Sequence, residues 1–195
     1  DINSNEQVSE KIEDTSGGIT FSLDDKYIFY SKLDKFHRPR KIYRHKIGSP
    51  VKEDELIFEE KSEAFTVGIN LTSDEKFFII TTSDHNTSEQ YYFNVDENKP
   101  KPKLIKNRKK GVIYSVNSWD SLFYIHTNEE AEDFKIDVCS DLSKQNWQEY
   151  IPAQNEVLIG GLTFLNNWII RSEVSDALAK VYVKNKLTGK EEEII

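Results

Sequence analysis

Short runs of apolar residues alternate with polar turns along the whole chain. The run Tyr27–Tyr30 follows a polar turn at Asp24–Lys26, and the run Phe77–Ile80 follows a similar turn at Asp74–Lys76. Asp can hydrogen-bond the backbone of its own turn and tolerates unusual φ angles, so each step predicts a tight hairpin between two strands. Apolar residues occupy both alternating faces of the second strand of each hairpin. This pattern is typical of a sheet that is covered on both sides.

The hairpin signal returns four times at a nearly constant spacing. Lys26 aligns with Lys76 after 50 residues, with Ser121 after a further 45 and with Asn167 after a further 46. A second β-prone element recurs in step with it, at Arg40–His45, Gln90–Val95, Phe134–Val138 and Lys180–Lys184. A third element closes each unit, at Leu56–Phe58, Leu104–Ile105, Trp147–Ile151 and Glu192–Ile195.

Each unit therefore predicts four strands within about 45 to 50 residues, which is the size and strand count of a β-propeller blade. We expect an all-β fold, a partial β-propeller of about four consecutive four-stranded antiparallel blades, at residues 16–60, 64–107, 111–154 and 158–195. No segment shows the apolar i, i+3, i+4, i+7 periodicity of a helix over three turns, so helix content should be low.

Residues 1–15 stand outside the four units. Val8 and Ile12 are four residues apart, which would suit a helical turn, and the stretch equally suits the outer strand of a preceding blade. Closed propellers have about four to eight blades, and nothing in the sequence marks a strand exchange between the two ends. We therefore expect an open arc, and its uncovered first and last faces predict self-association.

The composition is that of an ordinary globular domain, with 37% hydrophobic and 31% charged residues. No apolar run approaches the roughly 18 residues of a membrane span, and the N-terminus lacks the pattern of a secretory signal. The net charge of −8 argues against nucleic acid, because phosphate binding relies on clustered cations. The basic cluster within residues 99–110 is interrupted by Pro100 and Pro102 and is expected to be a solvated connector.

The chain contains one cysteine, Cys139, so no intramolecular disulfide can form. This fits a reducing compartment, and we expect a cytoplasmic location. Methionine is missing even from position 1, which favours a piece cut from a larger protein.

No catalytic, cofactor or metal site is predicted. The Gly-x-Ser-x-Gly turn of α/β-hydrolases is missing. The histidines have no zinc-ligand spacing; they are His37, His45, His85 and His126.

Structural roles are expected for the other conspicuous residues. The pairs Gly17–Gly18 and Gly160–Gly161 should each precede the first strand of a blade as turn residues. Cys139 should be a small apolar core residue, and so should the tryptophans Trp119, Trp147 and Trp168. The carboxylate pairs at turns and strand ends should carry solvated charge; they are Asp24–Asp25, Asp54–Glu55 and Glu59–Glu60.

Individual residues point to a family. The segment Asp34–Ser49 has an Asp, an Arg-Pro pair, an aliphatic strand and a His two residues before an aliphatic-Gly pair, and Asp54–Glu60 continues it to a Glu-Glu ending. This pattern resembles the propeller of oligopeptidase B-type enzymes in the prolyl oligopeptidase family. Further matches in order are Phe65, Thr87–Glu89, Arg108, Tyr114, Phe123–Asn128, Phe134, Trp147, Ile151–Pro152 and Phe164. The resemblance covers residues 14–185.

The resemblance implies a two-domain cytosolic serine peptidase that cuts short peptides after Lys or Arg. In that family a seven-bladed propeller covers the α/β-hydrolase active site and admits only oligopeptides. This chain would then be part of the gating and filtering propeller, inactive alone, with the hydrolase domain and short basic peptides as its partners. The Ser-Asp-His triad and about three further blades are missing from these residues, so no catalytic residue carries over. The repeat alone equally permits a free-standing propeller that serves as a protein-interaction scaffold.

Overall fold

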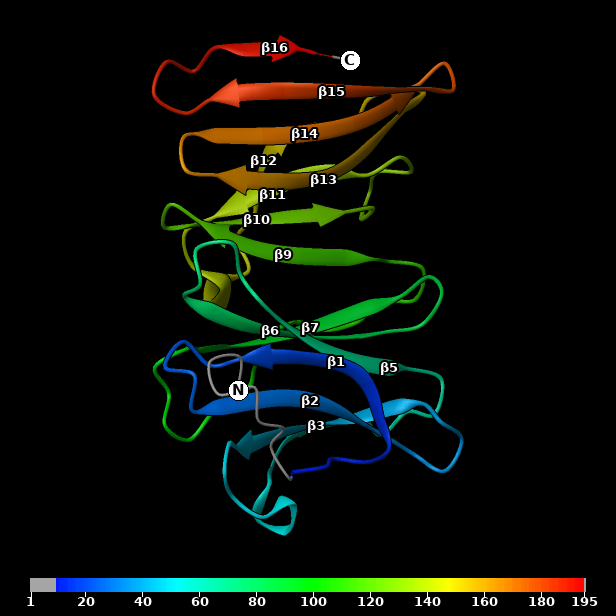
Figure 1. Cartoon of the computed structure of the whole chain (residues 1–195). Helices are drawn as coiled ribbons and strands as arrows, with labels where there is room; N and C mark the ends of the chain where they lie inside the picture. The colour runs from blue at the N-terminus through cyan, green and yellow to red at the C-terminus, as the bar shows by residue number, and fades with distance from the viewer. Residues whose placement is uncertain (1–9, 195) are drawn as a thin grey trace.

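The computed structural model describes residues 10–194 (Figure 1). Within this range, sixteen strands form four antiparallel sheets, each built from four strands that are consecutive in sequence. Sheet 1 contains β1 (Thr15–Phe21), β2 (Tyr27–Leu33), β3 (Pro39–Lys46) and β4 (Glu55–Glu59), and sheet 2 contains β5 (Thr66–Leu71), β6 (Phe77–Ser83), β7 (Ser88–Asn94) and β8 (Lys103–Lys106). Sheet 3 contains β9 (Tyr114–Trp119), β10 (Leu122–Thr127), β11 (Lys135–Cys139) and β12 (Gln148–Ile151), and sheet 4 contains β13 (Val157–Leu165), β14 (Trp168–Ser175), β15 (Leu178–Asn185) and β16 (Glu191–Glu193).

The predicted all-β class and the four-stranded antiparallel blades are confirmed. The helical segments in the described part are two 3-10 turns, Val51–Glu53 and Leu142–Lys144. Val8, one of the two residues behind the alternative of a helical turn, lies outside the described residues. Residues 10–14 form neither a helix nor a strand.

Local turn chemistry explains the hairpins that open sheets 1 and 2. Asp25 and Glu75 both have φ of 55°, the left-handed conformation that a tight turn requires. The Tyr27 amide donates to Ser22 Oγ (2.9 Å), and the Phe77 amide donates to a threonine hydroxyl in the equivalent place (3.1 Å). The hydroxyl thus closes each turn at its base, and the tight hairpins that the polar steps predicted are present.

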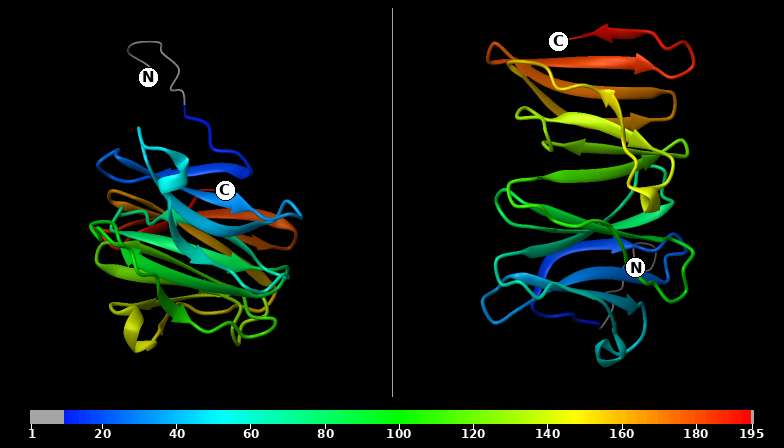
Figure 2. Two further views of the ribbon diagram at one scale, coloured as in Figure 1. Left: turned by 90° about the horizontal axis from the view of Figure 1, so that it is seen from below. Right: turned by 180° about the vertical axis from the view of Figure 1, so that it is seen from behind.

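The four sheets follow one another in a row in chain order, with the first and the last at opposite ends (Figures 1 and 2). An apolar core fills each of the three junctions. Phe29 and Ile42 of sheet 1 pack on Phe78 of sheet 2, and equivalent clusters join sheets 2 and 3 and sheets 3 and 4. Each of the two inner sheets is therefore covered on both faces, which explains why its second strand has apolar residues on both faces.

Polar side chains complete the junctions. The first strand of each sheet has one edge without a partner strand in its own sheet. In sheets 2, 3 and 4 the preceding sheet supplies hydrogen bonds to that edge. Ser31 Oγ of sheet 1 donates to the Val67 carbonyl of sheet 2 (3.3 Å), and His126 Nε2 of sheet 3 lies 2.8 Å from the Ile159 carbonyl of sheet 4. Because buried backbone groups must be paired, these bonds stabilise the packing of successive sheets.

The expectations for the glycine pairs and for Trp168 were wrong. The pairs Gly17–Gly18 and Gly160–Gly161 lie within β1 and β13, not before them, at shifts of strand register that mark β-bulges. Trp168 is not a core residue: it is 42% exposed, because it lies on the outer face of sheet 4, which no described sheet covers. Trp119 is buried and Trp147 is partly buried, as expected.

Candidate functional site

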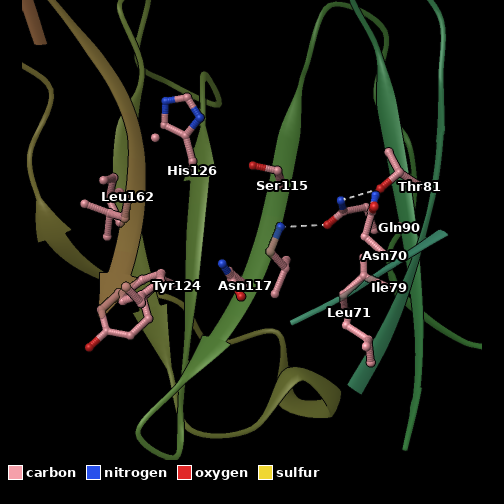
Figure 3. Close-up of a pocket in the computed structure, with 14 residues that line it drawn as sticks. Asn70, Leu71, Ile79, Thr81, Gln90, Ser115, Asn117, Tyr124, His126 and Leu162 are labelled. Carbon is pink, nitrogen blue, oxygen red and sulfur yellow. Dashed lines mark hydrogen bonds between the residues drawn. The ribbon is translucent and has the colours of Figure 1, made fainter. Parts of the chain in front are cut away.

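A pocket of about 340 Å³ lies on the side of the row where the first strands of sheets 2, 3 and 4 are found (Figure 3). In Figure 1, β5, β9 and β13 lie toward the viewer on this side. β5 contributes Asn70, β9 contributes Ser115 and Asn117, and β13 contributes Gly161 and Leu162. The pocket thus combines residues from three successive sheets.

The wall of the pocket on the sheet 2 side is held by a side-chain amide. Gln90 Oε1 accepts a hydrogen bond from the Val116 amide (2.7 Å), and Gln90 Nε2 donates to Thr81 Oγ1 (2.8 Å). Both bonds appear as dashed lines in Figure 3. They fix the orientation of the Gln90 amide and pair the free edge of β9, so the gap between sheets 2 and 3 is closed at this point.

The sheet 4 side contains the bulge of β13 and a histidine. A Cβ atom added to Gly161 would meet no atom within 4 Å, so the bulge leaves open space beside the pocket. The His126 ring stacks on Phe134, with ring centroids 4.6 Å apart. Since a carbonyl only accepts, the bond to Ile159 places a proton on His126 Nε2. Burial lowers the pKa of His126 below its ordinary value, so this imidazole is neutral at pH 7.

The lining suits binding more than reaction. It contains amide, hydroxyl, imidazole and apolar side chains, and no Asp, Glu, Lys or Arg. His126 already uses Nε2 in the bond to the backbone, and no carboxylate lines the pocket to orient the ring as a general base. Among residues 10–194, no group of three or more His, Cys, Asp or Glu is placed to hold a metal ion.

The histidines do not meet in one place. His37 and His85 lie exposed in turns between strands. His45 is only 1% exposed, and both of its ring nitrogens face carboxylates: Nδ1 lies 2.6 Å from Asp54 Oδ1, and Nε2 lies 3.2 Å from Glu10 Oε2. Burial opposes a charge on this ring, but the two carboxylates outweigh it and raise the pKa of His45.

A buried ion cluster joins sheets 1 and 2, and sequence reasoning missed it. Glu60 was expected to be solvated but is 5% exposed, because it bonds across the junction to Thr82 Oγ1 (2.5 Å) and Arg108 Nη2 (2.7 Å). Arg108 also donates to Glu89 Oε1 (2.8 Å), and Glu89 is 6% exposed. Asp54, likewise expected in solvent, is buried against His45. No local sequence pattern predicts these pairs, because the bonded residues of the cluster are 19 to 48 positions apart in the chain.

Burial alone would raise the pKa of Glu60 and of Glu89. The hydrogen bonds that the carboxylates accept, and the charge of Arg108, reverse this and lower the pKa of both below the ordinary value. Both side chains are therefore ionised at pH 7, and the cluster carries one net negative charge.

Cys139 is buried in the core between sheets 2 and 3, as expected for a small apolar residue. Burial raises the pKa of its thiol, which makes the thiolate scarce at pH 7. No described helix has the length and apolar character needed to cross a bilayer.

Consecutive four-stranded sheets that pack face to face in a row, each covering the next, define a segment of a β-propeller. Comparison with known proteins then gives the family. Residues 1–194 match the family described as "Prolyl oligopeptidase, N-terminal beta-propeller domain". The chain belongs to this family, as its residues suggested.

Relatives and solved structures agree with this assignment. Protease 2 of Moraxella lacunata is 33% identical over 175 residues, which cover 83% of this chain and 25% of that protein. Dipeptidyl aminopeptidase BI of Pseudoxanthomonas mexicana is 21% identical over 93% of this chain and 26% of that protein. Oligopeptidase B from Trypanosoma brucei, in its closed form with covalently bound antipain, superposes with a TM-score of 0.89 at 23% identity and covers 96% of this chain and 28% of that one. The chain therefore spans about a quarter of the length of the relatives it matches.

Proposed function

We propose that this chain is part of the gating and substrate-filtering propeller of an oligopeptidase B-type serine endopeptidase that hydrolyses short peptides after Lys or Arg. The observation that carries the proposal is the family match over residues 1–194, together with the residue pattern of Asp34–Glu60. The relatives are three to four times longer, which is consistent with an α/β-hydrolase domain of the same protein as the partner. In this proposal the chain alone has no peptidase activity, and the enzyme is cytoplasmic.

The described sheets are suited to act as a filter. The three junctions contain continuous apolar cores, and side chains such as Gln90 and His126 pair the free strand edges. A close-packed wall of this kind does not open for a folded protein, because each junction would have to give up its core. An extended peptide, by contrast, needs only a passage along the wall.

The test uses the full-length protein that contains this chain. The protein should release a fluorophore that is attached to the C-terminal Arg of a short peptide. It should also cut a sequence that contains Lys or Arg when this sequence is in a free peptide, but not when it lies within a folded domain. The 195-residue chain alone should show no turnover. Equal cleavage of the folded domain would refute filtering, and a lack of cleavage after Lys or Arg would refute the proposed specificity.

The two outer faces of the row favour a second candidate, an interaction scaffold that acts by itself. The outer face of sheet 1 forms an apolar groove of about 570 Å³ with Ile19, Phe21 and Ile28 in its lining, and sheet 4 exposes Trp168. Exposed apolar surface of this kind promotes association. Sedimentation of the isolated chain distinguishes the cases: self-association that persists when the hydrolase domain and the remaining propeller are added in trans supports the scaffold, and its loss supports the peptidase.

A further inference from the structure

The pocket between β5, β9 and β13 is neutral in a chain that is rich in charge. The chain has 26 Lys and Arg and 34 Asp and Glu among 195 residues, yet none of these lines the pocket. The titratable groups in the lining are His126 and Tyr124. Burial lowers the pKa of His126, and burial, with a smaller contribution from Tyr150, raises the pKa of Tyr124 to about 12, so both groups are uncharged at pH 7.

A second pocket shows that this neutrality is not a general property of the junctions. The pocket between sheets 1 and 2 is lined by Asp24, Arg44, Asp96 and Glu97, and Arg44 is bonded there to the Asn98 carbonyl. The neutral lining of the β5–β9–β13 pocket is therefore not imposed by its place between packed sheets.

The neutral pocket contains one side-chain amide that is held in place and two polar side chains that are available to bond a ligand. The Asn117 amide is oriented by Ser73, whose backbone N–H donates to Asn117 Oδ1 (2.8 Å) and whose Oγ accepts from Asn117 Nδ2 (2.8 Å). One N–H of Asn117 Nδ2 remains beyond these bonds. Asn70 and Ser115 are exposed in the pocket, and neither side chain bonds to another residue within 10–194.

These groups match the chemistry of a peptide backbone. An Asn side chain has the same donor and acceptor groups as a peptide unit, and a hydroxyl can serve as either. Tyr124 and Leu162 supply apolar surface beside them (Figure 3). A volume of about 340 Å³ is at the lower end of ligand pockets, which suits a few residues of extended chain. A Lys or Arg side chain, in contrast, would find no counter-charge.

We infer that this pocket binds a short, uncharged stretch of peptide through its backbone, and that the basic residue of the substrate is recognised elsewhere in the protein. The inference rests on the proposed function and adds to it a peptide subsite on the propeller wall. Such a site holds peptides of varied sequence, because it contacts groups that all peptides share.

The test is made on the full-length protein with two substrates that carry the same Arg-aminomethylcoumarin end. One has a single blocked residue before Arg, and the other has eight alternating Ala and Thr residues before it. Ser115→Trp fills the pocket, and Ser140→Trp, on an exposed loop of the same sheet, is the matched control. We expect Ser115→Trp to raise the KM of the long substrate about tenfold, with kcat and the short substrate unchanged. Ser140→Trp should change neither.

A second variant tests the role of neutrality. Ser115→Asp adds a charge with little volume, so it also replaces Ser115→Trp if that variant does not fold. It should lower the KM of a long substrate with two Lys residues in its upstream stretch, in a manner that added salt abolishes, because a carboxylate would supply the missing counter-charge. The inference is contradicted if Ser115→Asp changes the KM of the two-Lys substrate no more than it changes the KM of the Ala-Thr substrate.

Binding without hydrolysis separates the inference from the proposed function. The acetylated and amidated Ala-Thr decapeptide contains no basic residue, and its affinity for wild type and Ser115→Trp is measured by titration calorimetry. If wild type cleaves neither substrate but Ser115→Trp still weakens decapeptide binding, the proposed function fails and the subsite stands. If Ser115→Trp changes neither decapeptide binding nor the KM of the long substrate, the subsite is refuted.

Discussion

Replacement of Arg108 by methionine tests the buried ion cluster that joins sheets 1 and 2. The guanidinium donates to Glu60 (2.7 Å) and Glu89 (2.8 Å), and it lies 4.0 Å from the centroid of the Phe65 ring. Methionine retains part of the apolar contact with Phe65 but removes the only cation bonded to the two carboxylates within the described residues. The variant therefore leaves two ionised carboxylates buried without a counter-charge, although each keeps hydrogen bonds from other groups.

The size of the loss follows from burial. Removing one partner of a buried ion pair costs about 3–5 kcal/mol, because the remaining charge is desolvated without a partner. Glu60 and Glu89 are almost fully buried, but the Arg108 side chain is 27% exposed, so water screens part of the interaction. We expect Arg108→Met to lower the free energy of unfolding by about 3 kcal/mol, at the lower end of that range. Arg108→Lys keeps the charge without the planar fork and should cost less.

Urea unfolding, followed by tryptophan fluorescence, measures this change. With a slope of about 2 kcal/mol per molar, the midpoint should fall by about 1.5 M. The triple variant Arg108→Met, Glu60→Gln, Glu89→Gln also removes the two buried negative charges, so it should recover most of the lost stability. A midpoint for Arg108→Met within about 0.3 M of wild type, or a triple variant no more stable than Arg108→Met, would refute the reasoning.

The pH dependence of the free energy of unfolding provides an independent test, because wild type and Arg108→Met should respond to acid in opposite directions. In wild type the pKa of Glu60 and of Glu89 is lowered. Their contribution to the stability of the fold is therefore complete above the ordinary pKa of 4.5 and is lost as the pH falls through the folded-state pKa values. Burial is already the largest single influence on both groups, and without Arg108 it is opposed only by the remaining hydrogen bonds. The pKa of Glu60 and of Glu89 should therefore rise, so acidification should relieve the buried charge. Wild type should lose stability toward pH 4, while Arg108→Met should first gain it. Parallel pH profiles would contradict this account.

Three further predictions follow from the structure. The pKa of His45 is raised by its two carboxylates, so its stabilising effect is complete below the ordinary value of 6.5 and is lost as the pH rises through the folded-state value; His45→Gln should flatten the fall of the melting temperature above pH 6.5. Gly160→Ala should destabilise by about 1–3 kcal/mol in urea unfolding, because its Cβ would lie 2.8 Å from the Ser172 carbonyl oxygen, whereas Gly161→Ala meets no atom within 4 Å and should cost far less; equal effects would contradict the assigned bulge geometry. Cys139 should react with a thiol reagent only upon unfolding, since its thiol is buried and its pKa raised; rapid labelling of the native protein would contradict this.

Local patterns in the sequence were enough to predict the repeating units of this fold. Alternation of side chains and turn residues act over two to six residues, so the strand over Tyr27–Leu33 and the hairpin at Asp24–Lys26 could be predicted without tertiary information. Their return at a spacing of 45 to 50 residues was enough to indicate consecutive blades, because each unit leaves apolar faces that an equivalent neighbour can cover.

Which sheet faces are covered, and which side chains meet, could not be predicted before the packing of the sheets was known. Trp168 is a large apolar residue of the kind found in cores, but it is exposed because its sheet is the last in the row. Glu60 lies at a strand end, but it is buried because Arg108 bonds to it across a junction. The neutral pocket draws Asn70, Ser115 and Leu162 from three sheets, at distances along the chain over which no local pattern operates. Burial and charge pairing depend on contacts between sheets, so both emerge only once the sheets are packed.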